Sequence, residues 1–346
     1  MKKVFALIMV LVISVFMFTG CAKDTVNEQP NGQADEQQKE ENKDPVKIVA
    51  TGNGWDSQML HNEIAKLIVE NAYDGYTFET STGSSTMNWQ ALVAGDIDID
   101  IESWTDNVVS YPDDVANGDV VDIGVLVPDS SQGIYVPRYV IEGDKERGIE
   151  PMAPDLKTVE DLKKYPDIFP DDEDKSKGRI YGAIPGWMAD EILYKKYEYY
   201  GLNEMYNYTR LGSEATLFAS LVSAYNLGEP WVGYCYEPTW VSGKLDIVLL
   251  EDAPYDPELY PEGKCAFPSQ ELKIVTSRNF AEKAPDLLEF FTKYKTGSSI
   301  ISEALAYLDE TKCTHEEAAK WLLKEHDELL DEWLPKERAD RVRAIL

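Results

Sequence analysis

The length and charge of the chain restrict its class and its partners. It has 346 residues, with 33 Lys and Arg against 63 Asp and Glu, and a formal net charge of −30 at pH 7. So acidic a surface argues against nucleic acid or anionic lipid as a partner and raises the local concentration of small cations. The length is sufficient for two lobes that each bury a hydrophobic core.

The first 21 residues predict export. Two lysines precede an apolar run from Val4 to Phe18, and the letters F-T-G-C end the segment at Cys21. A basic start, a short apolar run and a small residue before the cut are typical of a secretory signal, and a bilayer needs roughly 20 apolar residues. The ending resembles a bacterial lipobox, which implies lipidation of Cys21 and a location on the outer face of the cell membrane. An uncleaved anchor helix is the alternative.

Residues 22–45 are predicted to be a disordered tether. The segment contains almost no apolar residues and many Gln, Glu, Asn and Asp. It cannot bury enough surface to offset the entropy lost on ordering, and as a flexible chain it would span on the order of 25–30 Å. We therefore expect a folded domain held beside the membrane through the lipid anchor alone.

The first part of the folded region alternates strands and helices. In chain order we expect a strand at 46–51, a helix at 59–72, a strand at 76–82, a helix at 85–96 and an alternating strand at 97–103. This rhythm is typical of a parallel α/β sheet, in which ligands bind beyond the carboxyl ends of the strands. Trp55 and Trp104 fall at such positions.

The second part repeats the rhythm and then returns. We expect a strand leaving at 133–140, a short helix at 158–164, a strand at 178–184, helices at 188–202 and 213–228, a strand at 230–236, a returning strand at 271–277 and helices from 281 to 346. Two α/β lobes joined by two hinge crossings form a bilobal, periplasmic-binding-protein-like (type II) fold. We assign residues 46–136 and 270–346 to lobe I and residues 137–269 to lobe II.

Four aromatic residues stand directly after predicted strands of both lobes: Trp55, Trp104, Trp187 and Tyr236. A quaternary ammonium has no donor hydrogen, but the face of an aromatic ring attracts its spread positive charge. Rings from both lobes around one cation would couple binding to closure. The alternative for any one ring is packing beneath its loop. The other tryptophans are predicted to be core residues: Trp89, Trp231, Trp240, Trp321 and Trp333.

Most of the folded chain resembles the glycine-betaine-type substrate-binding proteins of ABC transporters. The resemblance rests on GWDS (54–57), the segment VAGDIDI…SW ending at Trp104, PGW (185–187) and YEPTW (236–240), which is similar to a W-x-P-x-W motif of that family. It implies an aromatic prism of Trp104, Tyr236 and either Trp55 or Trp187 around a quaternary-ammonium ligand. It also implies a monomer that delivers glycine betaine, choline, carnitine or a related solute to an ABC permease.

The same resemblance implies that the backbone amides of Met188 and Ala189 hold a ligand carboxylate. A helix begins there, and free amides at a helix N-terminus favour anions. Some relatives add a His four or five residues after the first prism tryptophan, where this chain has Val108 and Val109. The motif also begins with Tyr236 in place of Trp, so the identity of the ligand stays open within the class.

Four acidic residues lie near the predicted cage: Asp56, Glu102, Asp106 and Glu237. They are candidate polar contacts for a ligand with more positive or hydroxyl character, such as choline. The alternative is that they are solvated loop residues.

An enzyme is the main rival class. The histidines His61, His315 and His326 are far apart on predicted helices, and none neighbours a cage residue in the sequence. Asp98 and Asp100 alternate on one strand, where charge on one face explains them without a metal. No hydrolase or zinc motif is present, so we expect no catalytic residue, metal or cofactor. A ligand-sensing lipoprotein, or a binding protein for another small cationic or zwitterionic solute, remains as the alternative.

Three cysteines follow Cys21 in the chain. Cys235, Cys265 and Cys313 have no metal-ligand spacing, and an odd number cannot pair completely. A disulfide between Cys235 and Cys265 is the one pairing considered, with free thiols as the favoured alternative.

Overall fold

The computed structural model describes residues 44–268 and 270–346. The predicted signal, the lipidated Cys21 and all but the last two residues of the tether lie outside the described residues. Among the described helices, none combines the length and the apolar character needed to cross a bilayer.

Helices and strands alternate through most of the described chain. The strands are β1 (Val46–Gly52), β2 (Tyr76–Thr82), β3 (Ile99–Ser103), β4 (Val120–Pro137), β5 (Gly178–Tyr181), β6 (Tyr206–Thr209), β7 (Gly233–Glu237), β8 (Ile247–Leu249) and β9 (Gln270–Ser277). The α-helices are α1 (Asp56–Ala72), α2 (Ser85–Ala94), α3 (Tyr111–Ala116), α4 (Arg138–Glu142), α5 (Met188–Tyr199), α6 (Glu214–Leu227), α7 (Trp240–Lys244), α8 (Phe280–Lys283), α9 (Pro285–Lys293), α10 (Ser298–Thr311), α11 (His315–Glu325), α12 (Glu328–Trp333) and α13 (Lys336–Arg343). Short 3₁₀ helices are η1 (Thr105–Asn107), η2 (Glu160–Lys164), η3 (Leu202–Glu204) and η4 (Tyr260–Glu262).

The strands form two sheets that share one long strand. The hydrogen-bonded order is β2-β1-β3-β9-β4-β7-β5-β6, with β8 also paired to β4. In the first sheet β1 pairs in parallel with β2 and β3, as the alternating pattern predicted, and β9 is antiparallel to both β3 and β4. In the second sheet β5 is parallel to β6 and β7, and β4 is antiparallel to β7 and β8.

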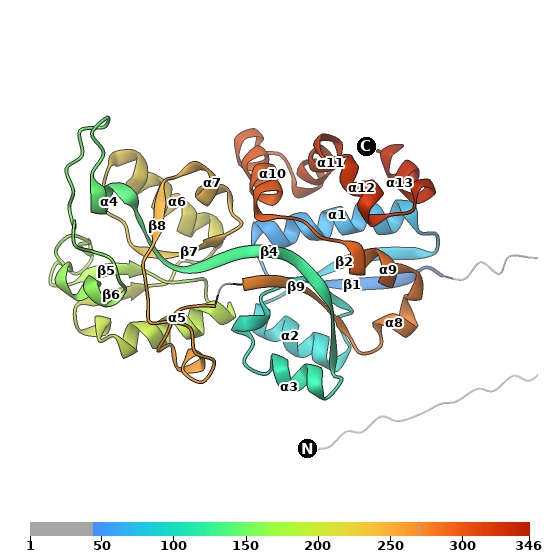
Figure 1. Ribbon diagram of the computed structural model, residues 1–346, viewed down its shortest axis with the longest axis horizontal. Coiled ribbons are helices and arrows are strands. Elements are labelled where there is room, and N and C mark those ends of the chain that lie inside the picture. Colours follow the sequence, from blue (N-terminus) through green and yellow to red (C-terminus); the bar gives the residue numbers. More distant parts are fainter. Residues whose placement is uncertain (1–43, 269) are drawn as a thin grey trace, which may run out of the picture. The chain divides into compact units, whose positions relative to one another are not determined.

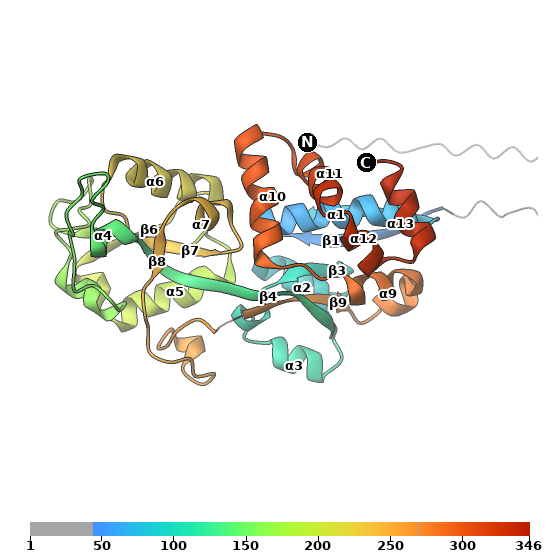
Figure 2. The same ribbon diagram turned by 45° about the horizontal axis from the view of Figure 1, so that its top comes forward.

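We call the elements around the first sheet lobe I and those around the second sheet lobe II. In Figure 1 the first sheet lies between α1 with the C-terminal helices on one side and α2 on the other. Figures 1 and 2 both show β4 running from one group of elements into the other. Because β4 pairs within both sheets, it belongs to neither lobe alone and marks no sharp boundary. The lobe boundaries at 136/137 and 269/270 therefore stay a prediction.

Three local predictions need correction. The strand expected at 133–140 begins at Val120 and ends at Pro137, and the next residues are helical. The segment before residue 133 contains Gly124 and a proline and lacks alternation, so its extended form depends on pairing with β9 rather than on local pattern. The strand expected at 178–184 ends at Tyr181, and neither β6 nor β8 was predicted.

Helix boundaries near the site follow local signals. Gly95 ends α2 with a left-handed φ of 84°, the stop expected from the sequence, because glycine adopts this conformation without a side-chain clash. Ser213 caps α6 and forms a reciprocal capping box with Thr216. This cap starts the helix at Glu214 and so fixes where that side chain lies.

Helix α5 is anchored to lobe II by a buried charge. The ammonium group of Lys196 is only 1 % exposed, and it donates hydrogen bonds to the Asp252 carboxylate and to the carbonyl of Cys265. The hydroxyl of Tyr200 donates to the same carboxylate. This ion pair ties α5 to the segment that follows β8. Cys235, Cys265 and Cys313 all carry free thiols, so the disulfide considered between Cys235 and Cys265 is not formed.

Breaking that ion pair should be costly. Lys196→Met leaves the buried Asp252 carboxylate without its cation, and we expect the free energy of unfolding to fall by about 3–5 kcal/mol. Chemical denaturation of the purified domain measures this.

The double variant Lys196→Met/Asp252→Leu should recover most of the loss, because it buries no unpaired charge. Lys175→Met is the matched control: Lys175 pairs with Asp172 on the surface, and its loss should cost less than about 1 kcal/mol. Equal effects of Lys175→Met and Lys196→Met would contradict the assignment.

Candidate functional site

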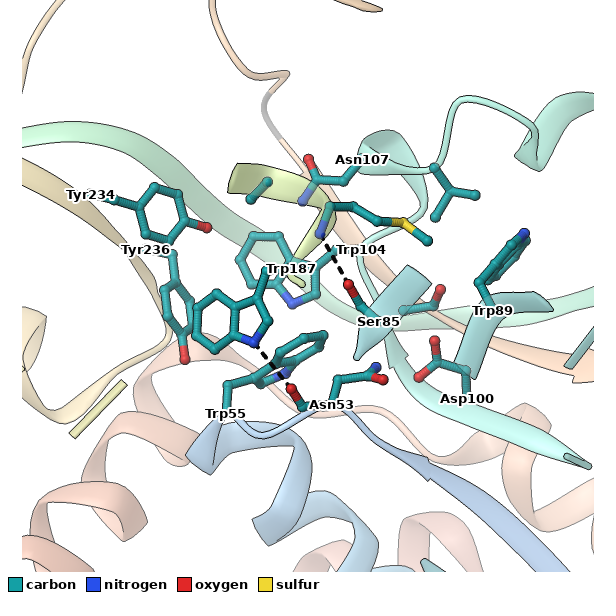
Figure 3. Close-up of a pocket in the computed structure, with 14 residues that line it drawn as sticks. Asn53, Trp55, Ser85, Trp89, Asp100, Trp104, Asn107, Trp187, Tyr234 and Tyr236 are labelled. Carbon is teal, nitrogen blue, oxygen red and sulfur yellow. Dashed lines mark hydrogen bonds between the residues drawn. The ribbon is translucent and has the colours of Figure 1, made fainter. Parts of the chain in front are cut away.

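A cavity lies between the lobes, beside the carboxyl ends of β1 and β3 (Figure 3). Its empty space is ≈ 450 Å³, a figure that includes open solvent. The lining residues are Asn53, Trp55, Ser85, Trp89, Asp100, Ser103, Trp104, Asn107, Val108, Trp187, Met188, Ala189, Tyr234 and Tyr236.

The structure brings together all four aromatic residues singled out from the sequence. Trp55 and Trp187 meet with their ring centroids 5.3 Å apart and their planes at 85°. Trp187 and Tyr236 are 5.9 Å apart at 81°, and Tyr236 and Trp104 are 5.4 Å apart at 87°. Neighbouring rings are therefore nearly perpendicular, like adjoining walls. We call these four residues the aromatic box; Figure 3 shows them grouped on one side of the cavity.

The indole N–H groups of the box are all satisfied by protein acceptors. Trp55 and Trp104 donate from Nε1 to the same oxygen, Glu102 Oε1, at 2.9 Å and 3.1 Å. Trp187 donates to the carbonyl oxygen of Asn53 at 3.0 Å. Because the N–H groups are already bonded, the rings have their faces and carbon edges left for a ligand. A ligand that needs no hydrogen-bond partner suits such walls.

Glu102 is fully buried behind the box, so its alternative assignment as a solvated loop residue is wrong. Oε1 also accepts from Ser57 Oγ at 2.8 Å, while Oε2 has no hydrogen-bond partner and lies 3.8 Å from His61 Nε2. Burial raises the pKa of Glu102 to about 8, although the three hydrogen bonds oppose the shift. Burial also lowers the pKa of His61 to about 3. His61 is remote from the cage in sequence, but it stands next to the carboxyl group that holds two cage rings.

Glu214 is a site residue that sequence reasoning missed. It is the first residue of α6, its Oε1 accepts the hydroxyl of Tyr236, and its Oε2 accepts the backbone N–H of Asp56 at 2.8 Å. Burial, reinforced by the negative charge of Asp56, raises the pKa of Glu214 to about 8. One signal in the sequence could have identified Glu214. It is an acidic residue directly after the helix cap Ser213, and this cap follows a strand of lobe II.

The other predicted acidic contacts do not line the cavity. The carboxylate of Asp56 lies 3.0 Å from His315 Nε2, a contact between α1 and α11 within lobe I. Asp106 and Glu237 are half-buried outside the cavity, and burial raises the pKa of each. As a direct contact to a ligand in this cavity, none of these three is supported.

Of the two backbone amides predicted to bind an anion at the start of α5, one already donates a hydrogen bond within the protein. The amide of Met188 donates to Ser85 Oγ at 3.0 Å, so a lobe I side chain takes the place expected for a carboxylate. Ala189 lines the cavity, and its amide has no hydrogen-bond partner among the described residues. Gly186 has a φ of 91°, and a Cβ there would lie 2.9 Å from Ser84 Cβ, so only glycine permits this approach of the lobes.

The rest of the lining is polar or aromatic apart from Val108, and it carries no cation. Trp89, predicted to be core, lines the cavity while its Nε1 donates to Asp114 at 2.9 Å. Asp100 accepts hydrogen bonds from Thr51 and Gln58, and burial raises its pKa to about 6. The lining contains no Lys, Arg or His. In the part of the chain that the structure describes, no group of three His, Cys, Asp or Glu side chains is arranged to hold a metal ion.

Hydrogen bonds between the lobes hold the cavity closed. Besides the contacts of Trp187, Met188 and Glu214 with lobe I, the hydroxyl of Tyr260 donates to Asn107 Oδ1 at 2.6 Å. Most of these donors or acceptors belong to residues that line the cavity. In this conformation the contacts that join the lobes therefore also complete the lining of the cavity.

Residues 45–325 match the protein family described as the substrate-binding domain of ABC-type glycine betaine transport systems. The chain belongs to this family. It is a substrate-binding protein of an ABC transport system, the class that the sequence motifs predicted, and the family is one of binding proteins rather than enzymes.

Similar proteins of known sequence or structure agree with this membership. A trimethylamine N-oxide-binding protein of Pelagibacter ubique is 26% identical over 331 residues, which cover 93% of this chain and 96% of that protein. A glycine betaine and L-proline-binding protein of Borrelia burgdorferi has a TM-score of 0.67 at 20% identity, covering 86% of this chain and 99% of its own. A choline-binding protein in complex with choline has a TM-score of 0.66 at 17% identity, with 87% and 98% covered. These likenesses confirm the predicted bilobal fold.

The buried carboxyl groups should make stability depend on pH. Glu102 and Glu214 keep their protons in the folded protein up to about pH 8, whereas the unfolded chain loses them near the ordinary value of 4.5. The unfolded state therefore binds fewer protons, and the free energy of unfolding should fall as pH rises across this interval. Glu102→Gln should flatten the fall between about pH 7 and about pH 8, where unfolded His61 is already neutral.

Denaturant titrations across that interval measure the slope. Glu289→Gln is the control, because Glu289 is exposed and paired with Lys293, and the change should leave the slope as it is. A wild-type curve that rises with pH over the interval, or a Glu102→Gln curve parallel to it, would count against the buried, protonated carboxyl group.

Proposed function

We propose that the protein captures a small quaternary-ammonium or N-oxide solute outside the cytoplasm and delivers it to the permease of an ABC importer. The observation that carries the proposal is the aromatic box, four buried rings from both lobes whose N–H and O–H groups are bonded to protein acceptors. Such faces attract a cation that cannot donate hydrogen bonds. Membership in the glycine betaine transport family and the relative named for trimethylamine N-oxide support it.

Within this class we propose a solute without a carboxylate, such as choline or trimethylamine N-oxide. The lining has no Lys, Arg or His to pair with a carboxylate, and the amide of Met188 already donates to Ser85. Asp100 adds an acidic group to the lining, which disfavours a second anion. Glycine betaine is the second candidate, because the amide of Ala189 at the start of α5 is a donor suited to an anion.

The cellular location and the oligomeric state are part of the same proposal. Export and lipidation of Cys21 are expected from the N-terminal sequence, and a monomer is what the family resemblance implies; together they support capture beside a permease. Metabolic labelling with a fatty acid in wild type and in Cys21→Ala tests the anchor. Incorporation of label by both chains, or by neither, would contradict it.

Loss of one wall of the box should weaken binding strongly. Trp104→Ala removes a desolvated cation–π contact worth about 2 kcal/mol, so we expect the Kd for choline or trimethylamine N-oxide to rise roughly thirty-fold. Isothermal calorimetry with choline, trimethylamine N-oxide, glycine betaine and carnitine measures this.

Trp321→Ala is the matched control, since Trp321 stacks on Tyr307 outside the cavity and its loss should leave the Kd unchanged. Binding weaker than about millimolar for every compound would refute the proposed function. An unchanged Kd in Trp104→Ala would show that the Trp104 ring does not contact the ligand.

The hydroxyl of Ser85 should influence discrimination against carboxylates. Ser85→Ala frees the amide of Met188, so two adjacent amides, with Ala189, would face the cavity. We expect the Kd for glycine betaine to fall relative to that for choline by roughly ten- to a hundredfold, the range of one hydrogen bond to a charged group.

The ratio of the two Kd values is the measurement, because it cancels general effects on closure. Ser176→Ala, in a surface loop, should leave the ratio at its wild-type value. If Ser85→Ala leaves this ratio unchanged, or changes it in favour of choline binding, the Met188 amide does not bind a ligand carboxylate.

A further inference from the structure

Glu102 is the point at which three donors around the aromatic box meet. The N–H groups of Trp55 and Trp104 and the hydroxyl of Ser57 all donate to its Oε1, from the start of α1 and the end of β3. We propose that Glu102 is a positioning residue that sets both lobe I tryptophans and that it gives up its proton when the cation binds, so that a negative charge then lies beside the box. This inference rests on the proposed function, because it requires a cationic ligand in the box.

The shared oxygen fixes the two rings relative to each other. An indole has a single N–H donor, and one acceptor for both rings restricts the rotation of each about its side-chain bonds. Trp55 and Trp104 sit on different elements, so without a common acceptor nothing in the local sequence would hold their faces in register. Both rings are less than 10 % exposed, at 6 % and 7 %, and Glu102 is at 0 %. The acceptor and all three of its donors belong to lobe I, so this part of the arrangement needs no contact from lobe II.

The second oxygen of Glu102, Oε2, makes no hydrogen bond and is therefore free to carry or release a proton. Oε2 and His61 Nε2 both lack hydrogen-bond partners, and 3.8 Å separates them. The other ring nitrogen of His61 lies 2.8 Å from the hydroxyl of Tyr294. When Tyr294 donates to that nitrogen, neutral His61 presents Nε2–H toward Oε2. In that tautomer the Nε2–H group of neutral His61 faces Oε2, which favours the ionised form of Glu102 although His61 carries no charge.

The groups around Glu102 set the direction of the proton step. Those that face it or act on its charge are Ser57 and His61 from α1, Asp100 and Trp104 from β3 and its end, Tyr294 after α9, Glu214 from α6 and Tyr236 from β7. None of them is a cation at neutral pH, because burial keeps His61 neutral. A bound quaternary ammonium would be the first positive charge in this cluster, and an adjacent positive charge favours the ionised form of a carboxyl group.

The step itself is simple. The O–H bond of the Glu102 carboxyl group breaks, the electron pair stays on the carboxylate, and the proton leaves to solvent. The cation and the carboxylate then form a buried pair of opposite charges across the rings. Acceptance of two indole N–H bonds by a carboxylate also pushes electron density into those rings, which strengthens their attraction for the cation.

Two consequences can be measured on the full domain. Binding of choline or trimethylamine N-oxide near pH 7 should release up to about one proton per ligand, and the affinity should rise with pH by up to about tenfold per unit below about pH 8. Calorimetry in buffers of different ionisation enthalpy counts the protons, and the Kd as a function of pH gives the midpoint. Trimethylamine N-oxide has a titrating oxygen at lower pH, so choline, whose charge is fixed, is the primary probe.

Glu102→Gln keeps an acceptor oxygen and removes the titration. We expect it to release no proton, to bind choline at least several-fold more weakly above about pH 8, and to show a Kd that no longer changes with pH. Glu289→Gln, the same change on the surface, should release the wild-type number of protons. A structural role alone for Glu102 would weaken binding equally at every pH, which would overturn the proton step.

Ser57→Ala keeps the test decisive should Glu102→Gln fold poorly. It removes one donor to the carboxylate and leaves both rings and the charge in place, so the midpoint of the pH dependence should move upward. An unmoved midpoint, or wild-type proton release from Glu102→Gln, overturns the inference while the proposed function stands. If wild-type protein binds none of the compounds, the proposed function fails, and the inference fails with it.

Discussion

A buried indole must place its N–H on an acceptor, and the acceptor then decides where the ring faces. That requirement organises the site. Trp55 and Trp104 share Glu102, and Trp187 reaches across to the backbone of Asn53 in the other lobe. The first two bonds build half of the box inside lobe I, and the third exists only when the lobes meet. Ring orientation and lobe closure thus depend on the same few polar contacts.

Those contacts come at a cost to the free energy of folding. Glu102, Glu214 and Asp100 are buried acidic groups, and burial raises the pKa of all three. An apolar side chain in place of Glu102 would avoid the desolvation of a carboxyl group but would leave two indole donors and a hydroxyl unsatisfied. Departures of this kind from ordinary core composition are expected at functional sites, where the surrounding fold must supply the stability.

The sequence was sufficient to locate the rings but not their partners. Trp55, Trp104 and Trp187 each follow a strand and Tyr236 lies near the end of one. The carboxyl ends of strands converge in an α/β sheet, so their meeting could be predicted. The position of Glu214 could not be predicted, because its role depends on how α6 approaches α1 across a sequence separation of 158 residues.

Other gaps have the same origin. Trp89 is buried in a hydrophobic cluster, as its helical pattern predicted, and the packing of the lobes also makes it a wall of the cavity. The N-terminal half of β4 has no strand alternation of its own and is extended because β9 pairs with it. Local pattern therefore identified the elements whose neighbours are close in the chain. It failed where a distant segment decides the conformation.

The long strand β4 has a mechanical consequence. Its pairing with β9 ends at Ser130 and its pairing with β7 begins at Ser131, so the chain changes sheets between two consecutive residues. The ladder with β9 already contains register shifts at Asp122/Gly124, Val125/Val127 and Val127/Ser130. Bulges of this kind bend a strand and increase its local twist. Any motion of one lobe against the other must therefore pass through this bent, continuous strand, whose hydrogen bonds to both sheets leave no slack loop between them at this crossing.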